Sequence, residues 1–231
     1  MPKQTPMADL GSEADRGRFL TPDDWLRAAV NLLIDEGVDQ VKVQRLAKAL
    51  GASRGSFYWH FRNRQNLLDE VLLLWKRTNT DALIESLGPS SLSLEERILG
   101  FFALLMEHHP FFPRFDNAIR AWAAKSPKAR KVQRTADRER QAHCQRLFLD
   151  AGYEEQEARV RGDVLYFNQV GYYVLDLGES KAQRLAKLEA YLLVFTGRPL
   201  DPALAKRFRA RQLGGLKAKD ADRPGGTAAA A

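Results

Sequence analysis

Residues 53–64 bring together side chains that could bind a DNA duplex. Arg54 can donate two hydrogen bonds to the edge of a guanine base, and Gly55 beside it leaves room for the backbone to approach closely. Tyr58 and His60 can each donate a hydrogen bond to a phosphate oxygen. These residue types at this spacing predict recognition of double-stranded DNA.

The charge distribution favours the same interpretation. The chain has 231 residues and a net charge of +7, and six of its basic residues fall between Lys42 and Leu68, where no Asp or Glu occurs. A basic surface of this kind attracts the phosphate backbone. The residues predicted to contact DNA are Lys42, Gln44, Ser53, Arg54, Gly55, Ser56, Tyr58, His60, Arg62 and Arg64. A second basic stretch, residues 206–223, is predicted to be a solubilising tail.

Three helices and a glycine turn would position these residues. Thr21 can cap a first helix that begins at Pro22. Two short helices meet at the turn Gly51–Ala52 and form a helix-turn-helix, whose second helix would enter the major groove. Phe57 and Phe61 are expected to pack inward. The helices predicted in this part of the chain cover residues 22–36, 43–50, 53–58 and 64–87.

The remainder of the chain also has the pattern of helices, and the alternation typical of strands is not found. Apolar residues recur at helical spacing, and Gly or Pro punctuates the segments. The helices predicted here cover residues 94–108, 113–125, 127–151, 154–177 and 180–196. The predicted fold class is therefore all-α.

Residues 22–75 resemble the TetR family of bacterial transcription regulators. The resemblance rests on Gly37, on the run VQRLAKALGASRGSFYWHFRNR over residues 43–64, and on Leu67-Leu68. Its most distinctive part is the small-x-Tyr-x-His-Phe pattern at residues 56–61.

The family resemblance also assigns roles to single positions. Tyr58 and His60 match the family's phosphate-contacting Tyr and His, and Gln44 matches a position that often reaches DNA. Arg64 stands where the family usually has Lys, which keeps the charge but changes the donor geometry.

The resemblance implies a homodimer with an N-terminal three-helix DNA-binding domain and a C-terminal helical domain for ligand binding and dimerisation. Most members are repressors that a small ligand releases from a palindromic operator, and this function is expected here. A transcriptional activator of the same fold is the alternative. The expected domains are a disordered arm (1–20), the DNA-binding domain (21–66), the ligand-binding and dimerisation domain (67–212) and a disordered tail (213–231).

Helix bundles place ligand sites between helices, among apolar side chains and a few polar groups. A dense aromatic cluster begins at Phe101 and predicts such a site for an unknown, apolar or aromatic effector. The residues predicted to bind it are Phe101, Phe102, Leu105, Met106, His109, Phe115, His143, Gln169, Tyr172 and Tyr173.

The last two predicted helices carry apolar stripes that a second copy of the chain could bury. Ordinary packing within one chain is the alternative. The residues predicted to form the dimer interface are Val160, Val164, Phe167, Gly171, Val174, Leu185, Leu188, Leu192 and Phe195.

Other functions are weaker interpretations. The run Gly51–Gly55 fits G-x-S-x-G, the nucleophile elbow of hydrolases, but that motif needs a strand before its serine. A helical binding protein without DNA contact is a further alternative, which the retained basic residues disfavour. The single cysteine, Cys144, is expected to be a packing residue rather than a redox switch. We expect no enzymatic activity, no cofactor and no metal site.

The predicted location is the cytoplasm. The chain has no apolar run near the ~20 residues that a membrane-spanning helix needs. Its first 20 residues lack the apolar stretch of a secretory signal.

Overall fold

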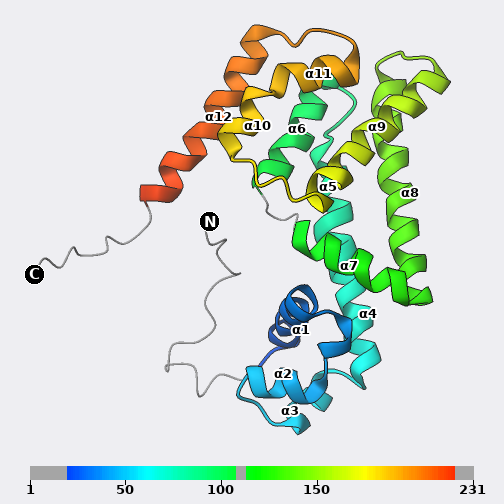
Figure 1. The fold of residues 1–231 in the computed structure, drawn as a ribbon, viewed down its shortest axis with the longest axis vertical. Helices are drawn as coiled ribbons and strands as arrows, with labels where there is room; N and C mark the ends of the chain where they lie inside the picture. The colour runs from blue at the N-terminus through cyan, green and yellow to red at the C-terminus, as the bar shows by residue number, and fades with distance from the viewer. Residues whose placement is uncertain (1–19, 108–112, 222–231) are drawn as a thin grey trace, which may run out of the picture. The chain divides into compact units, whose positions relative to one another are not determined.

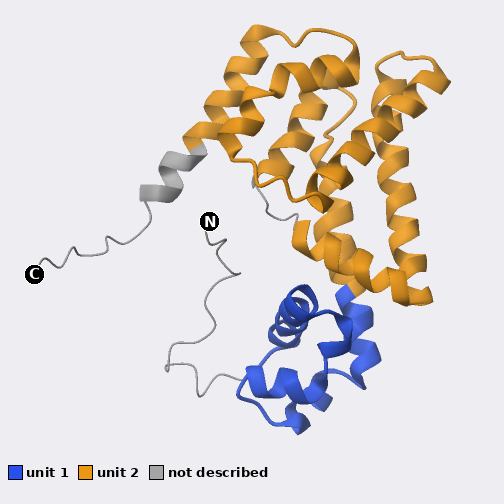
Figure 2. Ribbon diagram, viewed as in Figure 1, with its two compact units in different colours: residues 1–71 blue, residues 72–231 orange. Residues whose placement is uncertain are grey.

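The computed structural model describes residues 20–107 and 113–221, and every regular element in these ranges is a helix (Figure 1). The predicted all-α fold class is confirmed. The chain forms two compact units, residues 1–71 and 72–231 (Figure 2). The division falls inside one helix, after residue 71 rather than after residue 66 as predicted. Apart from Leu20, the predicted N-terminal arm lies outside the described residues.

The first unit begins with helix α1, Pro22–Glu36, which starts where the sequence predicts. The backbone N–H of Asp24 donates to the Thr21 hydroxyl at 3.3 Å, and the Asp24 carboxylate accepts from the Thr21 N–H at 2.8 Å. This capping box satisfies N–H groups that have no partner within the helix. Gly37, with a φ of 86°, ends the helix in a conformation that favours glycine.

The helix-turn-helix follows directly. A short 3-10 helix, η2 (Val38–Gln40), leads into α2 (Val43–Ala49) and α3 (Arg54–His60). Gly51 makes the turn between α2 and α3 with a φ of 61°. Helix α3 ends two residues later than predicted, because its backbone bonding continues until Phe61 caps it.

An aromatic core holds α3 in place within the first unit. The rings of Trp25 and Phe57 meet edge to face with centroids 5.3 Å apart, and Phe57 stacks on Phe61 at 5.4 Å. All three side chains are buried. The predicted inward packing of Phe57 and Phe61 is confirmed, and it leaves the opposite side of α3 free.

The helix predicted over residues 64–87 is three elements. They are α4 (Arg64–Trp75), a π-helical segment η3 (Lys76–Asp81) and α5 (Ala82–Ser86). Within this region the Thr78 hydroxyl donates to the Leu74 carbonyl at 3.0 Å. A side chain that competes for a helix carbonyl disturbs regular α-helical bonding.

The second unit contains the longest helices of the described chain. Its elements after α5 are α6 (Leu94–Glu107), α7 (Pro113–Lys125), α8 (Pro127–Asp150), α9 (Glu155–Val174), α10 (Lys181–Ala186), α11 (Leu188–Thr196) and α12 (Pro202–Ala221). Helices α8 and α9 run side by side after the turn at Gly152 (Figure 1). A Cβ added at Gly162 would lie 2.5 Å from the Gln145 Cα, so only glycine permits this close approach.

Two features of the second unit differ from the predicted pattern. The helix predicted over residues 180–196 breaks at Lys187 into α10 and α11. Helix α12 was not predicted, and its backbone is helical to Ala221, where a disordered tail was expected from residue 213. Buried Ala205 and Phe208 explain why α12 packs on the unit.

A buried polar network joins several helices of the second unit. The Asp116 carboxylate of α7 accepts from the Trp75 indole and from Arg140, both at 3.0 Å. Arg140 of α8 is fully buried, lies over the Trp75 ring and donates to the Thr80 hydroxyl of η3 at 3.0 Å. The network therefore fixes η3 against α7 and α8.

Arg120 extends this network to α9. It donates to Asp116 at 2.8 Å and to both carboxylate oxygens of Asp137, and the Tyr166 hydroxyl donates to Asp137 at 2.6 Å. Burial raises the pKa of Asp116, but the charges of Arg140 and Arg120 outweigh it and hold that pKa below its ordinary value. Asp116 is therefore a carboxylate at neutral pH.

Candidate nucleic-acid interface and cavity

Helix α3 presents its polar side to solvent. Arg54 and Gly55 are exposed at its first turn, and the Tyr58 side chain is 54% exposed one turn later. Lys42 and Gln44 are exposed on the neighbouring α2. These five residues, which were predicted to contact DNA, are therefore all accessible to solvent on the first unit.

Local bonding explains the position of α3. The Ser53 hydroxyl accepts from the Ser56 N–H at 3.2 Å and so caps the helix. A Cβ added at Gly55 would meet only the Ser53 hydroxyl, at 3.5 Å, so the surface beside Gly55 is open. Ser53 thus has a structural role, and its predicted contact with DNA stays a prediction.

Four basic side chains of the helix-turn-helix make no ion pair or side-chain hydrogen bond with any described residue. They are Lys42, Lys48, Arg54 and Arg62, and all are exposed. Their charges remain available for an anionic partner such as a phosphate backbone. Arg45, by contrast, forms a two-point ion pair with Glu36 at 2.6 and 2.7 Å, and the Arg45 hydrogen bonds lower the pKa of Glu36.

Arg64 lies differently from what its predicted role requires. Its Nε donates to the Val41 carbonyl and its Nη2 to the Val38 carbonyl, each at 2.5 Å. The side chain is half-buried and ties the first turn of α4 to the segment before α2. Arg64 is therefore a positioning residue, and only part of its guanidinium is left for the predicted phosphate contact.

Trp59 is the residue that the sequence-based prediction omitted. Its side chain is 88% exposed, the highest value among the large apolar residues of the described chain. It follows Tyr58 on α3, while Phe57 and Phe61 occupy the buried side. Helical periodicity could have placed Trp59 outside. Successive residues of a helix are about 100° apart, so residue 59 lies nearly opposite the inward positions 57 and 61.

The hydrolase interpretation of Ser53 is wrong. The element before the serine is helix α2, whereas a nucleophile elbow follows a strand. The Ser53 hydroxyl is engaged in a helix cap.

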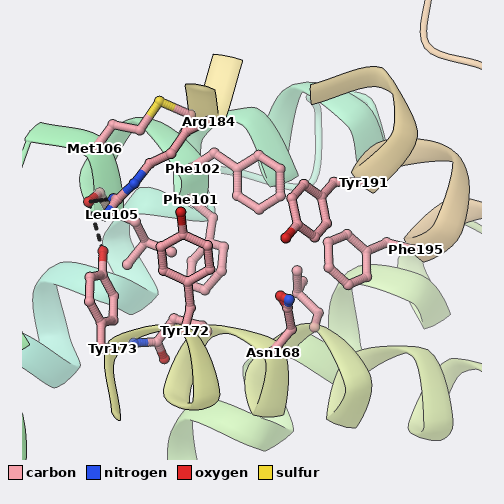
Figure 3. Close-up of a pocket in the computed structure, with 12 residues that line it drawn as sticks. Phe101, Phe102, Leu105, Met106, Asn168, Tyr172, Tyr173, Arg184, Tyr191 and Phe195 are labelled. Atoms are coloured by element: carbon pink, nitrogen blue, oxygen red, sulfur yellow. Dashed lines mark hydrogen bonds between the residues drawn. The ribbon is translucent and has the colours of Figure 1, made fainter. Parts of the chain in front are cut away.

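A largely apolar cavity that opens to solvent lies among α6, α9, α10 and α11 (Figure 3). It brings together seven residues predicted to bind an effector: Phe101, Phe102, Leu105, Met106, Gln169, Tyr172 and Tyr173. Five further residues line it: Asn168, which the sequence also offers as a polar lining residue, and Leu165, Arg184, Tyr191 and Phe195, which the sequence-based prediction did not assign to it. Arg184, Tyr191 and Phe195 belong to α10 and α11, which approach the cavity only through tertiary packing.

Three predicted effector residues lie elsewhere. Phe115 is buried in α7 and does not line the cavity, and His143 is exposed on α8. His109 lies outside the described residues. Helix α8 turns His143 outward because its inward stripe is occupied by Cys144, Leu147 and Phe148.

Part of the predicted dimer interface is exposed and part is not. Val160, Val164, Phe167 and Val174 are exposed along α9, and nothing lies within 4 Å of a Cβ added at Gly171. The residues predicted from the last helix are buried within the chain: Leu185, Leu188, Leu192 and Phe195. Their assignment to the interface is corrected, because they pack into the core of the second unit.

Another side of α11 faces solvent instead. Leu193 and Val194 are exposed, Val194 to 68%. The exposed residues of α9, Val160, Val164, Phe167 and Val174, are called the α9 stripe. A groove lined by Val160, Val164 and Val194 connects this stripe with the exposed side of α11. The exposed apolar face of the second unit is thus formed by the α9 stripe and the outer side of α11.

Cys144 is fully buried, and burial raises its pKa to about 12. A thiol in this state is not nucleophilic at neutral pH. The expected packing role is supported.

Comparison with known proteins finds similarity to one family of regulators in the first unit. Residues 26–71 match the model of the family "Bacterial regulatory proteins, tetR family". The class A tetracycline repressor protein from transposon 1721 of Escherichia coli is 46% identical over 52 residues, which cover 22% of this chain and 24% of the repressor. The class E tetracycline repressor protein of Escherichia coli is 29% identical over 142 residues, 60% of each chain. The chain thus spans between a quarter and three-fifths of the length of these relatives.

Solved structures resemble the chain over a greater length. A TetR-family transcriptional regulator from Marinobacter aquaeolei superimposes with a TM-score of 0.60, and AmtR from Mycobacterium smegmatis with a TM-score of 0.58. They share 18% and 16% sequence identity with this chain, cover 84% and 88% of it, and are themselves covered to 98% each. At these identities the likeness concerns the fold.

Proposed function

We propose, from the premise that residues 26–71 match the model of the tetR family of bacterial regulatory proteins, that the chain is a ligand-released repressor of transcription that binds a palindromic operator as a homodimer. The observation that carries this function is the exposed side of α3 and α2. It offers four unpaired basic side chains, Arg54 among them, together with Tyr58 and Trp59 at accessible positions. It is a surface for a nucleic acid rather than an active site.

The geometry supports a division of roles on the duplex. Arg54, at the first turn of α3, would donate to a guanine edge in the major groove. Tyr58 and His60 would donate to phosphate oxygens, and Trp59 would pack on the sugar-phosphate backbone beside them. Lys42 and Lys48 on α2 would add charge where the backbone passes.

Dimerisation is supported by the exposed apolar face of the second unit. Single exposed apolar residues are common, but a continuous stripe at helical spacing is typical of an interface. A second copy would cover the α9 stripe and the outer side of α11. Two recognition helices would then read half-sites that are roughly 34–36 Å apart on one face of the duplex.

Ligand release would require that the effector binds the two states of the dimer with different affinity. The cavity of the second unit is the proposed effector site. Helix α4 connects the two units covalently, because the division between them falls within it. We propose that α4 passes a change at the effector site to the helix-turn-helix.

A transcriptional activator of the same fold would bind DNA with the same surface and is the alternative. A helical binding protein without DNA contact is disfavoured by the four free basic side chains. Within the described residues, none of the helices is long and apolar enough to span a lipid bilayer. We propose a cytoplasmic location, where a DNA-binding protein meets its operator, and no enzymatic activity.

The test is selection of duplexes from a random pool by the full chain, followed by titration in gel shifts. We expect the chain to enrich an inverted repeat and to bind it at least about a thousandfold more tightly than a scrambled duplex. Enrichment without an inverted repeat would contradict the palindromic operator. Equal affinity for both duplexes would contradict specific regulation.

A further inference from the structure

We propose that the cavity among α6, α9, α10 and α11 binds an aromatic carboxylate, with the carboxylate at Arg184 and the ring between the aromatic walls. This inference rests on the proposed function, because the ligand proposed here would be the effector of that regulator.

The cavity walls favour a flat ring. Phe102 meets Tyr191 and Phe195 edge to face, with centroids 6.3 and 6.1 Å apart, and Tyr191 stacks on Phe195 at 5.8 Å. Aromatic pairs at these separations gain energy from geometry as well as from buried area. Figure 3 shows these rings around one space, with the Tyr172 ring on another side. An aliphatic chain of equal size would fill that space without gaining the ring contacts.

Arg184 supplies a positive charge at this cavity. Its guanidinium lies over the Tyr172 ring at 4.7 Å, and its Nη1 donates to the Leu105 carbonyl at 3.3 Å. Its Nε is buried and has no hydrogen-bond partner. Among the described residues that line the cavity, Arg184 alone carries a charge.

The described residues provide Arg184 with no paired anion. Glu179 is close enough for Arg184 to influence its pKa, but its carboxylate is bonded to the Lys187 ammonium and the Tyr172 hydroxyl. A buried donor on a cation is costly unless an acceptor pairs with it. A carboxylate on the ligand would accept from the free Nε in a charge-assisted hydrogen bond.

Gln169 provides the second polar group that points to a ligand. Its side chain is only 4% exposed, and its amide oxygen has no hydrogen-bond partner. In Figure 3 the Asn168 amide and the Tyr191 hydroxyl also point into the space between the rings. An unpaired acceptor on a residue that lines an apolar cavity favours a ligand that donates, such as one with a ring hydroxyl.

The experiment compares an acid with its neutral amide. Calorimetric titration of the full chain uses 4-hydroxybenzoate, 4-hydroxybenzamide and decanoate as probes. We expect 4-hydroxybenzoate to bind about tenfold to a hundredfold more tightly than the amide, because only the acid pairs with Arg184. The variant Arg184→Met is expected to abolish this preference, and Arg184→Lys to retain part of it.

Arg198→Met is the matched control. Arg198 also lies over a tyrosine ring, that of Tyr153 at 5.0 Å, but it does not line the cavity. This variant is expected to keep the acid–amide ratio of the parent chain. Circular dichroism establishes that each variant is folded, and the ratio in the parent chain decides the question even if Arg184→Met fails to fold.

Several results would overturn the inference. They are equal affinity for the acid and the amide, an unchanged ratio in folded Arg184→Met, tighter binding of decanoate than of 4-hydroxybenzoate, and binding of none of the probes. Gel shifts without ligand on the same samples keep the two proposals apart. A chain that binds its operator but not the acid contradicts this inference alone, whereas a chain that binds the acid but no operator contradicts the proposed function.

Discussion

Arg54 and Arg62 are both exposed arginines of the helix-turn-helix, but we expect them to contact different parts of the duplex. Arg54→Ala should lower affinity for the selected operator by about 1–3 kcal/mol and leave affinity for a scrambled duplex nearly unchanged. Arg62→Ala should weaken both and reduce the slope of affinity against salt concentration by about one. Fluorescence anisotropy over a range of NaCl concentrations measures both quantities. Equal losses on both duplexes for Arg54→Ala would contradict its base-reading role.

Arg64 belongs to a different class of residue. From the sequence alone, Arg64→Ala would be expected to flatten the salt dependence, as for a phosphate contact. Because its guanidinium holds the Val41 and Val38 carbonyls, we expect Arg64→Ala mainly to destabilise the first unit, by about 1–3 kcal/mol. Urea unfolding followed by tryptophan fluorescence measures this, with Arg62→Ala as the exposed control. A large change of salt slope without loss of stability would support the phosphate contact instead.

The sequence predicts which side of a helix a residue occupies better than it predicts the residue's hydrogen-bond partners. The exposure of Arg54 and Tyr58 follows from their place on a helix whose other side carries Phe57 and Phe61. The bonds of Arg64 could not be predicted, because its two acceptors lie 23 and 26 residues earlier in the chain. The role of Arg184 was missed for the same reason.

At the scale of the helices, the network around Asp116 is expected to dominate stability. Asp116→Asn should lower the free energy of unfolding at pH 7 by about 3–5 kcal/mol, because it leaves buried Arg140 without its charge partner. Glu155→Gln, in an exposed pair with Arg159 at 3.6 Å, should change it by no more than about 0.5 kcal/mol. Urea titrations of the three proteins give these values.

The same carboxylate predicts a pH dependence with a definite sign. The pKa of Asp116 is lower in the folded chain than its ordinary value near 3.8. The stabilisation is therefore fully present above that ordinary value and is lost as the pH falls through the lower, folded pKa. We expect the difference between the parent chain and Asp116→Asn to shrink below about pH 4. A difference as large at pH 3 as at pH 7 would contradict a network that depends on the ionised carboxylate.

Helix ends were predicted best where caps mark them. Thr21 with Pro22 fixed the start of α1, and the predicted bounds of α7 are those observed. The break at Lys187 was missed because apolar spacing continues through it, from Leu185 to Leu188. The π-helical segment η3 was missed because its six polar residues include no Gly or Pro to mark a change in the helix. Helix α11 is apolar on nearly every side, so periodicity could not decide which stripe faces the core.

At the scale of the whole molecule, the exposed face of the second unit predicts the oligomeric state. Phe167 lies within the α9 stripe and is 55% exposed. Phe167→Glu should convert the dimer to a monomer and weaken operator binding by at least about tenfold, because a charge replaces an apolar contact. Sedimentation velocity and gel shifts measure the two effects.

Leu92→Glu is the matched control, since Leu92 is also an exposed large apolar residue but lies outside the helices of the stripe. It should remain dimeric. A parent chain that sediments as a monomer would contradict the proposed interface. Dissociation by Leu92→Glu but not by Phe167→Glu would locate the interface elsewhere.

The rate at which the sole thiol of the chain is labelled would measure how often α8 and α9 separate. Cys144 lies fully buried where α9 approaches α8 closely, next to Gly162, and burial raises its pKa to about 12. A thiol-reactive dye added under native conditions should therefore label only molecules in which the two helices have separated. Mass spectrometry of the labelled fraction over time would report that rate, and Gly162→Ala should raise it. Rapid labelling of the parent chain would mean that this helix pair separates often in the folded protein.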